Sequence, residues 1–112
     1  VAYCNWLSEL KGLEKVYVAG EEGVTIRPEA GGFRLPTEAQ WEYAAGNGSR
    51  HSKYSWGDGP PRGKKGGNVA DETARKKYPD WTIFDGYRDG YVYTAPVGSY
   101  DPNDFGLYDM SG

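Results

Sequence analysis

Between residues 47 and 102, half of this 112-residue chain consists mainly of turn-forming residues. Asn-Gly, Gly-Asp-Gly-Pro-Pro, two Asp-Gly pairs and Asp-Pro follow one another, and these are residues that turns favour. Such a long connection inside a compact domain is usually functional, or is held by something other than backbone ladders. Aromatic side chains and a bound metal ion are the two candidates. The aromatic residues available are Tyr54, Trp56, Trp81, Phe84, Tyr91 and Tyr93.

The composition excludes several classes of protein. The net charge is only −3 and the chain contains ten Tyr and four Trp, which argues against a disordered polyelectrolyte. A pI near 5.1 argues against a nucleic-acid partner, because such partners normally need a pI above about 9. The basic cluster Arg62, Lys64 and Lys65 is expected to be a solvated loop. No apolar run approaches the roughly 20 residues that a membrane span needs.

Periodicity predicts few regular elements. An apolar stripe predicts a helix over 2–10 that ends at Lys11–Gly12. Two short strands, 16–19 and 24–26, are expected to form a hairpin, and 33–35 is expected to be extended. A second helix begins after Thr37 in a capping-box pattern and ends at Gly46, with Trp41, Ala44 and Ala45 facing inward. The expectation is an α+β domain, rich in loops, with short strands and two helices.

No catalytic constellation is visible in the residues. His51, the sole histidine, could act as a general base, but a surface-loop role is favoured because no partner lies near it in the sequence. Cys4 is interpreted as a buried thiol or half of a structural disulfide, since a nucleophile needs a positive, exposed setting. Glu38 and Glu42 stand one helical turn apart, and with Arg34 nearby a structural ion pair is favoured over a catalytic carboxylate pair.

Hard oxygen donors gather in the second half of the chain. Asp85–Tyr87 and Asp89–Tyr91 repeat an Asp-Gly-Tyr motif, and Asn68 and Asp71–Glu72 precede them. Calcium takes six to eight oxygen ligands from carboxylates, amides, main-chain carbonyls and water. Asp-Gly pairs are also ordinary turns. The residues alone therefore leave a metal-binding loop and a plain turn-rich loop as alternatives.

Six sequence blocks resemble the formylglycine-generating enzyme family, also called sulfatase-modifying factor domains. They are AYCNWL at 2–7, FRLPTEAQWEYAA at 33–45, YSWG at 54–57, NVAD at 68–71, TAPVG at 94–98 and FGLYDMSG at 105–112. The resemblance spans nearly the whole chain and implies a C-type-lectin-like fold. It implies that residues 1–112 are an internal fragment, a partial domain without its C-terminal catalytic part.

The resemblance also implies structural calcium. At the matching positions a first site takes the Asn68 side chain, the Val69 carbonyl, the Asp89 side chain and the Tyr91 carbonyl, with Asp85 as the alternative to Asp89. A second site begins with the Asp109 side chain and the Gly112 carbonyl, and its other ligands follow Gly112.

Members of this family oxidise a sulfatase cysteine to formylglycine with oxygen, copper(I) and two cysteines. Soft thiolates hold Cu(I), and those cysteines lie beyond this sequence; Cys4 matches a structural disulfide cysteine, and Ala45 occupies the position of another. Copper is therefore expected only in a full-length enzyme. Other family-like domains are non-catalytic and bind a ligand or a protein, as variable proteins or as modules attached to bacterial kinases. Both readings allow a protein or peptide partner, and neither indicates a compartment.

Overall fold

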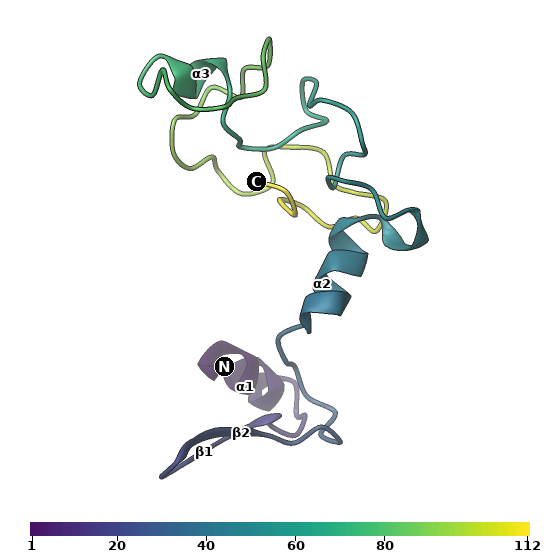
Figure 1. Ribbon diagram of the computed structural model, residues 1–112. Coiled ribbons are helices and arrows are strands. Elements are labelled where there is room, and N and C mark those ends of the chain that lie inside the picture. The colour runs from purple at the N-terminus through teal and green to yellow at the C-terminus, as the bar shows by residue number, and fades with distance from the viewer. The chain divides into compact units, whose positions relative to one another are not determined.

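The computed structural model describes residues 1–112, which form two compact units, 1–37 and 38–112. The first unit contains helix α1 (Ala2–Leu10) and strands β1 (Tyr17–Gly20) and β2 (Gly23–Ile26) (Figure 1). The second contains helix α2 (Glu38–Ala45), the short 3-10 helix η1 (Gly48–Arg50) and helix α3 (Glu72–Arg75). The mixed, loop-rich α+β class is confirmed. None of the helices has the length and apolar character that crossing a membrane requires.

The predicted hairpin is present. β1 and β2 pair antiparallel, with Tyr17 opposite Ile26 and Gly20 opposite Gly23, so the turn between them consists of two residues. The strands lie within one residue of the predicted bounds. Residues 33–37 have no regular secondary structure, because their main chain is held by side chains of the first unit. Leu35 N–H donates to the Tyr17 hydroxyl at 2.8 Å.

The core of the first unit is small and consists of Cys4, Val16 and Tyr17, with Ala30 packed against it. Cys4 is a buried free thiol, which is one of the two alternatives that the sequence predicted. Asn5 joins α1 to β1: its Nδ2 donates to the Tyr17 carbonyl at 2.7 Å, and Tyr17 N–H donates back to Oδ1 at 3.2 Å. These contacts make the hairpin and the helix one packed element.

The buried face of α1 is not its apolar stripe. Tyr3, Trp6 and Leu10 are exposed, while Cys4 and Ser8 are buried. Ser8 Oγ donates to the Cys4 carbonyl and accepts from Phe33 N–H, both at 2.8 Å. The helix turns its hydrogen-bonding residues inward because they supply partners for the chain that follows.

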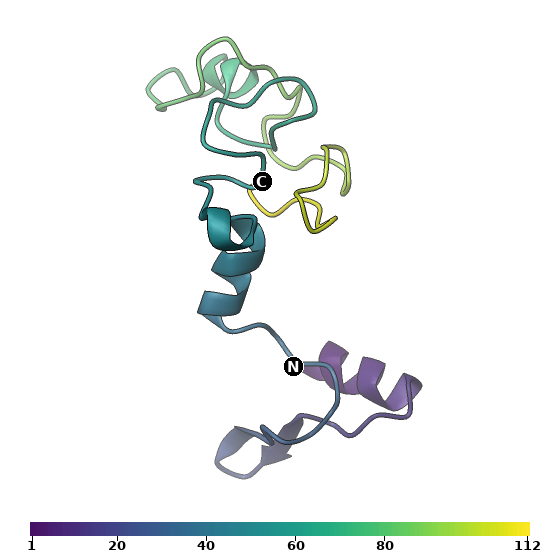
Figure 2. The same cartoon turned by 90° about the vertical axis from the view of Figure 1, so that its right-hand side faces the viewer.

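Helix α2 forms where the sequence predicts it, but the expectation that Trp41 faces inward is wrong. Trp41 is 47% exposed, and Ala45 is the buried residue of the helix. The helix has eight residues and packs against η1, which follows its last turn. Burial is therefore concentrated at the C-terminal end of α2, the end that leads into the loops of the second unit (Figure 2).

Rings hold part of the second unit, as predicted. Tyr54 stacks on Trp56 with centroids 4.7 Å apart, and Phe84 meets both rings edge-on at 5.6 and 6.3 Å. Tyr87 is buried and its hydroxyl lies 3.2 Å from the Gly67 carbonyl. Chain segments 30 residues apart are thus fixed to each other without a strand between them.

Two buried asparagines join the end of α2 to the C-terminal loop. Asn103 Nδ2 donates to the Ala44 carbonyl at 2.6 Å, and its Oδ1 accepts from Phe105 and Leu107 N–H at 3.0 and 3.1 Å. Asn47 Oδ1 accepts from Asp104 N–H at 2.9 Å. These side-chain amides supply the main-chain hydrogen-bond partners that neighbouring strands supply in a sheet.

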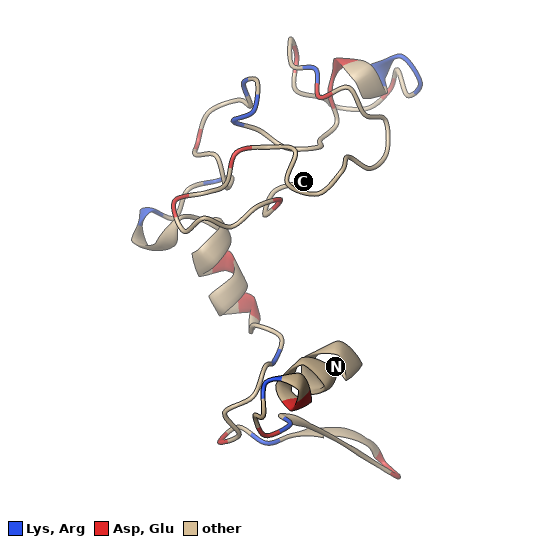
Figure 3. Ribbon diagram, turned by 180° about the vertical axis from the view of Figure 1, so that it is seen from behind, with Lys and Arg blue, Asp and Glu red and all other residues tan.

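The prediction of two helices missed α3. This helix has four residues, too short for an apolar period to reveal. Its N-cap is Asp71, whose side chain accepts from Thr73 and Ala74 N–H. Charges of both signs occur along both units (Figure 3), and the basic residues 62–65 form an exposed tight turn in which Arg62 and Lys65 exchange main-chain hydrogen bonds.

Candidate functional site

Asp89 lies at the centre of the candidate cation site. Its two carboxylate oxygens accept from two main-chain groups, Val69 N–H at 3.0 Å and Tyr91 N–H at 2.7 Å. Val69 is 20 residues away in the sequence. The carboxylate therefore holds residues 68–69 beside residues 89–91, which are the two segments that the resemblance assigns to one site.

The Asn68 side chain turns into the same loop, because its Nδ2 donates to the Tyr93 carbonyl. Its amide oxygen is the atom left to bind a cation. No hydrogen bond within the chain ends on the main-chain carbonyl of Val69 or of Tyr91. These oxygens are suited to bind a cation, because they belong to half-buried residues whose main chain is held by hydrogen bonds, and because their lone pairs are free.

Two carboxyl groups lie close together at this site and have opposite pKa shifts. Burial raises the pKa of Asp89, and the charge of Asp71 adds to this, although hydrogen bonds from Tyr91 and Val69 act in the other direction. Burial also acts to raise the pKa of Asp71, but main-chain N–H groups of Asp89, Ala74 and Thr73 outweigh it, so that pKa is lowered. A cation beside Asp89 would offset the cost of burying its charge.

The charges of the same two carboxyl groups act on Tyr100. It is 8% exposed, and its hydroxyl has no hydrogen-bond partner. Burial, together with the negative charge of Asp89, raises its pKa to about 12. A buried hydroxyl without a hydrogen-bond partner is uncommon in a folded protein.

The residues fit a hard divalent cation. One carboxylate, one amide oxygen and two main-chain carbonyls are four of the six to eight oxygens that calcium takes, and water supplies the rest. No group of three or more His, Cys, Asp or Glu residues is placed to hold a metal ion through those side chains alone. The candidate site therefore depends on main-chain and amide oxygens, which suits calcium better than zinc.

The two residues assigned to a second site lie next to the first. Asp109 Oδ2 accepts from Gly98 N–H at 2.7 Å. Gly112 packs so closely on Asn68 that a Cβ added to it would lie 2.5 Å from the Asn68 carbonyl oxygen. Asn68, Asp109 and Gly112 together line a cavity of about 160 Å³. Residues of the two expected sites thus share one cavity wall.

The repeated Asp-Gly-Tyr motif has two different environments. In the first copy Asp85 is exposed and pairs with Arg75 at 2.5 Å, while Tyr87 is buried. In the second copy Asp89 is half-buried against Val69. The geometry therefore favours Asp89 over Asp85 as the carboxylate of the candidate site, since only Asp89 lies beside residues 68–69.

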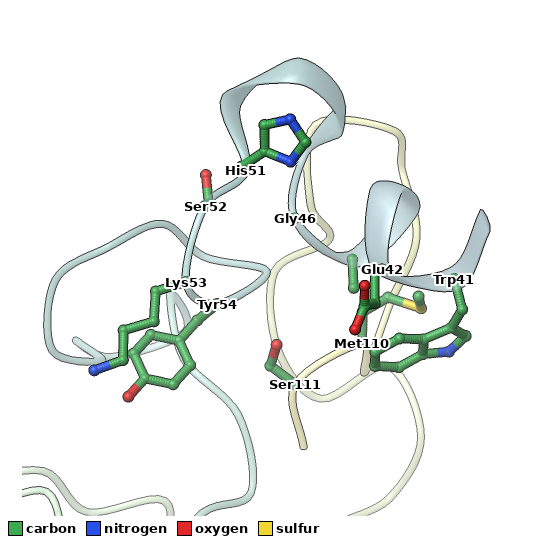
Figure 4. A pocket seen from close by; sticks show the side chains of 10 residues that line it. Trp41, Glu42, Gly46, His51, Ser52, Lys53, Tyr54, Met110 and Ser111 are labelled. Atoms are coloured by element: carbon green, nitrogen blue, oxygen red, sulfur yellow. The ribbon is translucent and has the colours of Figure 1, made fainter. Parts of the chain in front are cut away.

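His51 and Glu42 line a separate cavity of about 340 Å³. Figure 4 shows Trp41, Glu42 and Met110 across this cavity from His51, Lys53 and Tyr54. No hydrogen bond or ion pair joins His51 to Glu42. His51 is exposed, with a left-handed φ of 49°, so it is a surface-loop residue, as expected.

The prediction from the residues noted Asp71 as an oxygen donor but missed its role as a cap. The signal was present, because Asp at an N-cap followed by Glu and Thr is a helix start. No local sequence signal indicated that the Tyr93 carbonyl would bond Asn68 or that Tyr100 would sense the charges of Asp71 and Asp89. Both depend on chain segments that only folding brings together.

Comparison with known proteins agrees with the resemblance. Residues 1–112 match the family described as sulfatase-modifying factor enzyme 1-like domain. The formylglycine-generating enzyme of Thermomonospora curvata is 39% identical over 98 residues, which is 87% of this chain and 30% of that protein. The inactive C-alpha-formylglycine-generating enzyme 2 of Bos taurus is 37% identical over 82 residues, 72% of this chain and 24% of that protein.

The crystal structure of CarF superposes with a TM-score of 0.66 at 31% identity, covering 98% of this chain and 41% of that chain. The chain thus spans less than half the length of each of these proteins. Because the family model matches its whole length, the chain belongs to the sulfatase-modifying factor enzyme 1-like domain family.

Proposed function

We propose that this chain is the scaffold portion of a domain that oxidises a cysteine of a protein substrate to formylglycine. The observation that carries this proposal is the 39% identity to a formylglycine-generating enzyme over 87% of the chain. The substrate would be a protein or peptide, of which sulfatases are the example that the family resemblance implies.

Copper would be held outside these residues. The chain has a single cysteine, Cys4, which is buried in the core of the first unit and cannot supply the two thiolates that hold Cu(I). When bound, copper(I) supplies the activation of oxygen. The role of residues 1–112 in the reaction is to support the substrate cleft and the loops around it.

The test is oxidation of a cysteine-containing sulfatase peptide by the full-length protein, loaded with copper and supplied with oxygen. The expected result is an aldehyde at the cysteine position, detected by mass spectrometry and by hydrazide capture. A correctly folded, copper-loaded protein that leaves the peptide unchanged would overturn the enzymatic proposal.

A second candidate function is binding without chemistry. The similarity to a relative named as inactive favours it, and so do the exposed rings of Trp81 and Tyr93, which are 49% and 63% exposed. Peptide binding by the full-length protein without conversion of the cysteine would select this alternative over the enzyme.

We also propose that the Asp89 site binds a structural calcium ion through Asn68, Val69, Asp89 and Tyr91, with Asp109 and Gly112 beginning a second site. The support is the convergence of residues 68–69 and 89–91 on one carboxylate. Calcium would replace the regular hydrogen-bonded framework that this loop lacks.

Chelation tests this site. EDTA should lower the melting temperature of the full-length protein and calcium should restore it. Asp89→Ala should behave as the chelated protein, because it removes the charged ligand and leaves the turn-forming Gly90. Asp85→Ala is the matched control, since it removes the carboxylate at the same position of the other motif copy, where it is exposed and pairs with Arg75 instead of Val69. Calcium titration without heat or thermal shift would overturn the proposal.

A further inference from the structure

Residues 71–73, which we call the 71–73 triplet, reach from the start of α3 to the loop that carries Asp89. A side-chain oxygen of each of the three accepts a hydrogen bond from a different main-chain N–H of that loop. The pairs are Asp71 Oδ2 with Asp89 at 2.5 Å, Glu72 Oε1 with Gly86 at 3.1 Å and Thr73 Oγ1 with Gly90 at 3.3 Å. The main chain adds Glu72 N–H to the Tyr87 carbonyl at 3.1 Å.

Asp71 is fully buried, at 0% exposure. Its Oδ1 caps α3 by accepting from Thr73 and Ala74 N–H at 2.7 and 3.0 Å, while Oδ2 accepts from Asp89 N–H. Each of its oxygens is therefore already engaged by main-chain N–H groups. Because it is fully buried and also accepts from the Thr73 hydroxyl, this carboxylate is placed to shape the neighbouring loop, whereas the half-buried Asp89 accepts only one N–H on each oxygen.

Asp89 is held at both of its ends. Its N–H donates to the Asp71 carboxylate, and its own carboxylate accepts from Val69 and Tyr91 N–H. The next residue, Gly90, is fixed by Thr73 and has a φ of 89°, a left-handed turn that returns the chain toward Tyr91. Removing the bonds from the 71–73 triplet would leave the main chain of Asp89 and Gly90 without these partners, and the carboxylate would keep only its bonds to Val69 and Tyr91 N–H.

We propose that the 71–73 triplet is a positioning element of the cation site: it fixes the main chain of Asp89 and Gly90 so that the carboxylate and the Tyr91 carbonyl stand ready for the ion. This inference rests on the calcium site proposed above. A loop ordered in advance loses less conformational entropy when it binds. Partners that orient the ligands of a metal typically change its affinity 10- to 100-fold when they are removed.

Coupling between α3 and the ion follows by reciprocity. If the triplet strengthens cation binding, the bound cation strengthens the triplet by the same free energy. Calcium should therefore slow hydrogen exchange at the Thr73 and Ala74 amides, which Asp71 caps, although neither residue touches the ion.

The main experiment measures the calcium dissociation constant of the full-length protein by calorimetry. Asp71→Asn should raise this constant about tenfold or more, because the amide Nδ2 cannot accept the N–H that Oδ2 accepts now. Asp80→Asn is the matched control: it removes the same charge from an exposed residue without a hydrogen bond or ion pair, and should leave the constant unchanged.

Thr73→Val keeps the protein testable should Asp71→Asn fail to fold. It preserves side-chain shape and removes the hydroxyl that accepts from Gly90 N–H and donates to Asp71 Oδ2, while the N-cap bonds of Asp71 remain. Thr82→Val is the control at an exposed threonine. We expect a smaller rise in the dissociation constant and, with terbium in place of calcium, a luminescence lifetime that reports more bound water. A purely structural role would lower the melting temperature and leave both readings as in the wild type.

The outcomes separate the two proposals. A wild-type protein that binds neither calcium nor terbium overturns the cation site and, with it, the role of the triplet. A wild-type protein that binds calcium, with folded variants that bind it equally well, overturns the positioning role alone.

Discussion

In residues 1–37 a helix and a hairpin share a small apolar core, whereas residues 38–112 contain two short helices and one 3-10 turn spread over twice the length. The first unit is joined through Cys4, Val16 and Tyr17. The second is joined through side chains that hydrogen-bond to the main chain of distant loops: Asn47, Asp71, Asp89 and Asn103. The difference shows that turn-rich chain stays ordered when polar side chains supply the partners that strands would supply.

The largest loss of stability is expected where one side chain holds the most main chain. Asn103→Ala removes three hydrogen bonds, to Ala44, Phe105 and Leu107, and should cost roughly 3 kcal/mol at about 1 kcal/mol for each bond. Urea unfolding measures it. Asp104→Ala is the control, because it removes only an exposed ion pair with Arg50, worth about 0–1 kcal/mol. Equal losses would show that the hydrogen bonds of Asn103 do not stabilise the second unit.

Calcium should act on one unit and not on the other. By mass action a hundredfold excess over the dissociation constant adds about 2.7 kcal/mol. Hydrogen exchange with and without EDTA should therefore change in residues 68–93 and stay the same in residues 2–26. Exchange that changes uniformly along the chain would argue against a local cation site.

The effect of calcium should also depend on pH, with a definite sign. Burial raises the pKa of Asp89, so in cation-free protein this group favours folding at low pH and that contribution is lost as pH rises through its folded pKa. A cation needs the charged form. Stabilisation by calcium should therefore grow as pH rises through this raised pKa, and melting curves across the acidic range measure it.

A polar contact also matters in the first unit, but to a smaller extent. Ser8→Ala removes the hydroxyl that accepts from Phe33 N–H and leaves that donor without its partner, at a cost of about 1–2 kcal/mol. Urea unfolding measures this, with Ser49→Ala as the control at an exposed serine. A loss as large as that of Asn103→Ala would show that both units depend on polar side chains to the same degree.

Removing one group from the second unit should have the opposite sign. Tyr100→Phe deletes a buried hydroxyl that has no partner, and the cation-free protein should gain about 1 kcal/mol because the cost of desolvating that group disappears. Thermal melting in EDTA measures the gain. A loss of stability would indicate that the hydroxyl has a bonding role.

The smallest effect is spectroscopic. The hydrogen bond from Lys77 and that from Tyr78 lower the pKa of the exposed Tyr93 hydroxyl. Lys77→Met should raise that pKa toward the ordinary tyrosine value while the melting temperature stays unchanged. Ultraviolet titration of the phenolate measures it, and Lys76→Met is the neighbouring control.

Local signals predicted the elements that contain their own determinants. The hairpin at 17–26 follows from two short strand-like segments around Gly20 and Gly23, and α2 follows from the pattern after Thr37. The inward position of Trp41 was wrong, because which face of a short helix is buried depends on what packs against it. Helix α3 was missed because four residues are too few to show a helical period of apolar residues, although the sequence does carry the Asp71 N-cap signal.

The candidate site divides in the same way. Oxygen donors at 68 and 89 were expected from residue type and from the family blocks, and the choice between Asp85 and Asp89 was open. The structure places Asp89, and not Asp85, against residues 68–69. Asp89 N–H donates to the Asp71 carboxylate and the Asp89 carboxylate accepts from Val69 N–H, and both contacts span about 20 residues. No pattern within either segment carries that information.

The class of fold, the family and the kinds of ligand atom available could be predicted from the amino-acid sequence, since these depend on composition, short motifs and residue chemistry. The folded chain was needed to see which of two identical motifs lies beside residues 68–69, which faces of the helices are buried, and that residues 71–73 bond the loop of Asp89. These outcomes depend on hydrogen bonds between distant segments, and such bonds form only when the whole chain has closed around them.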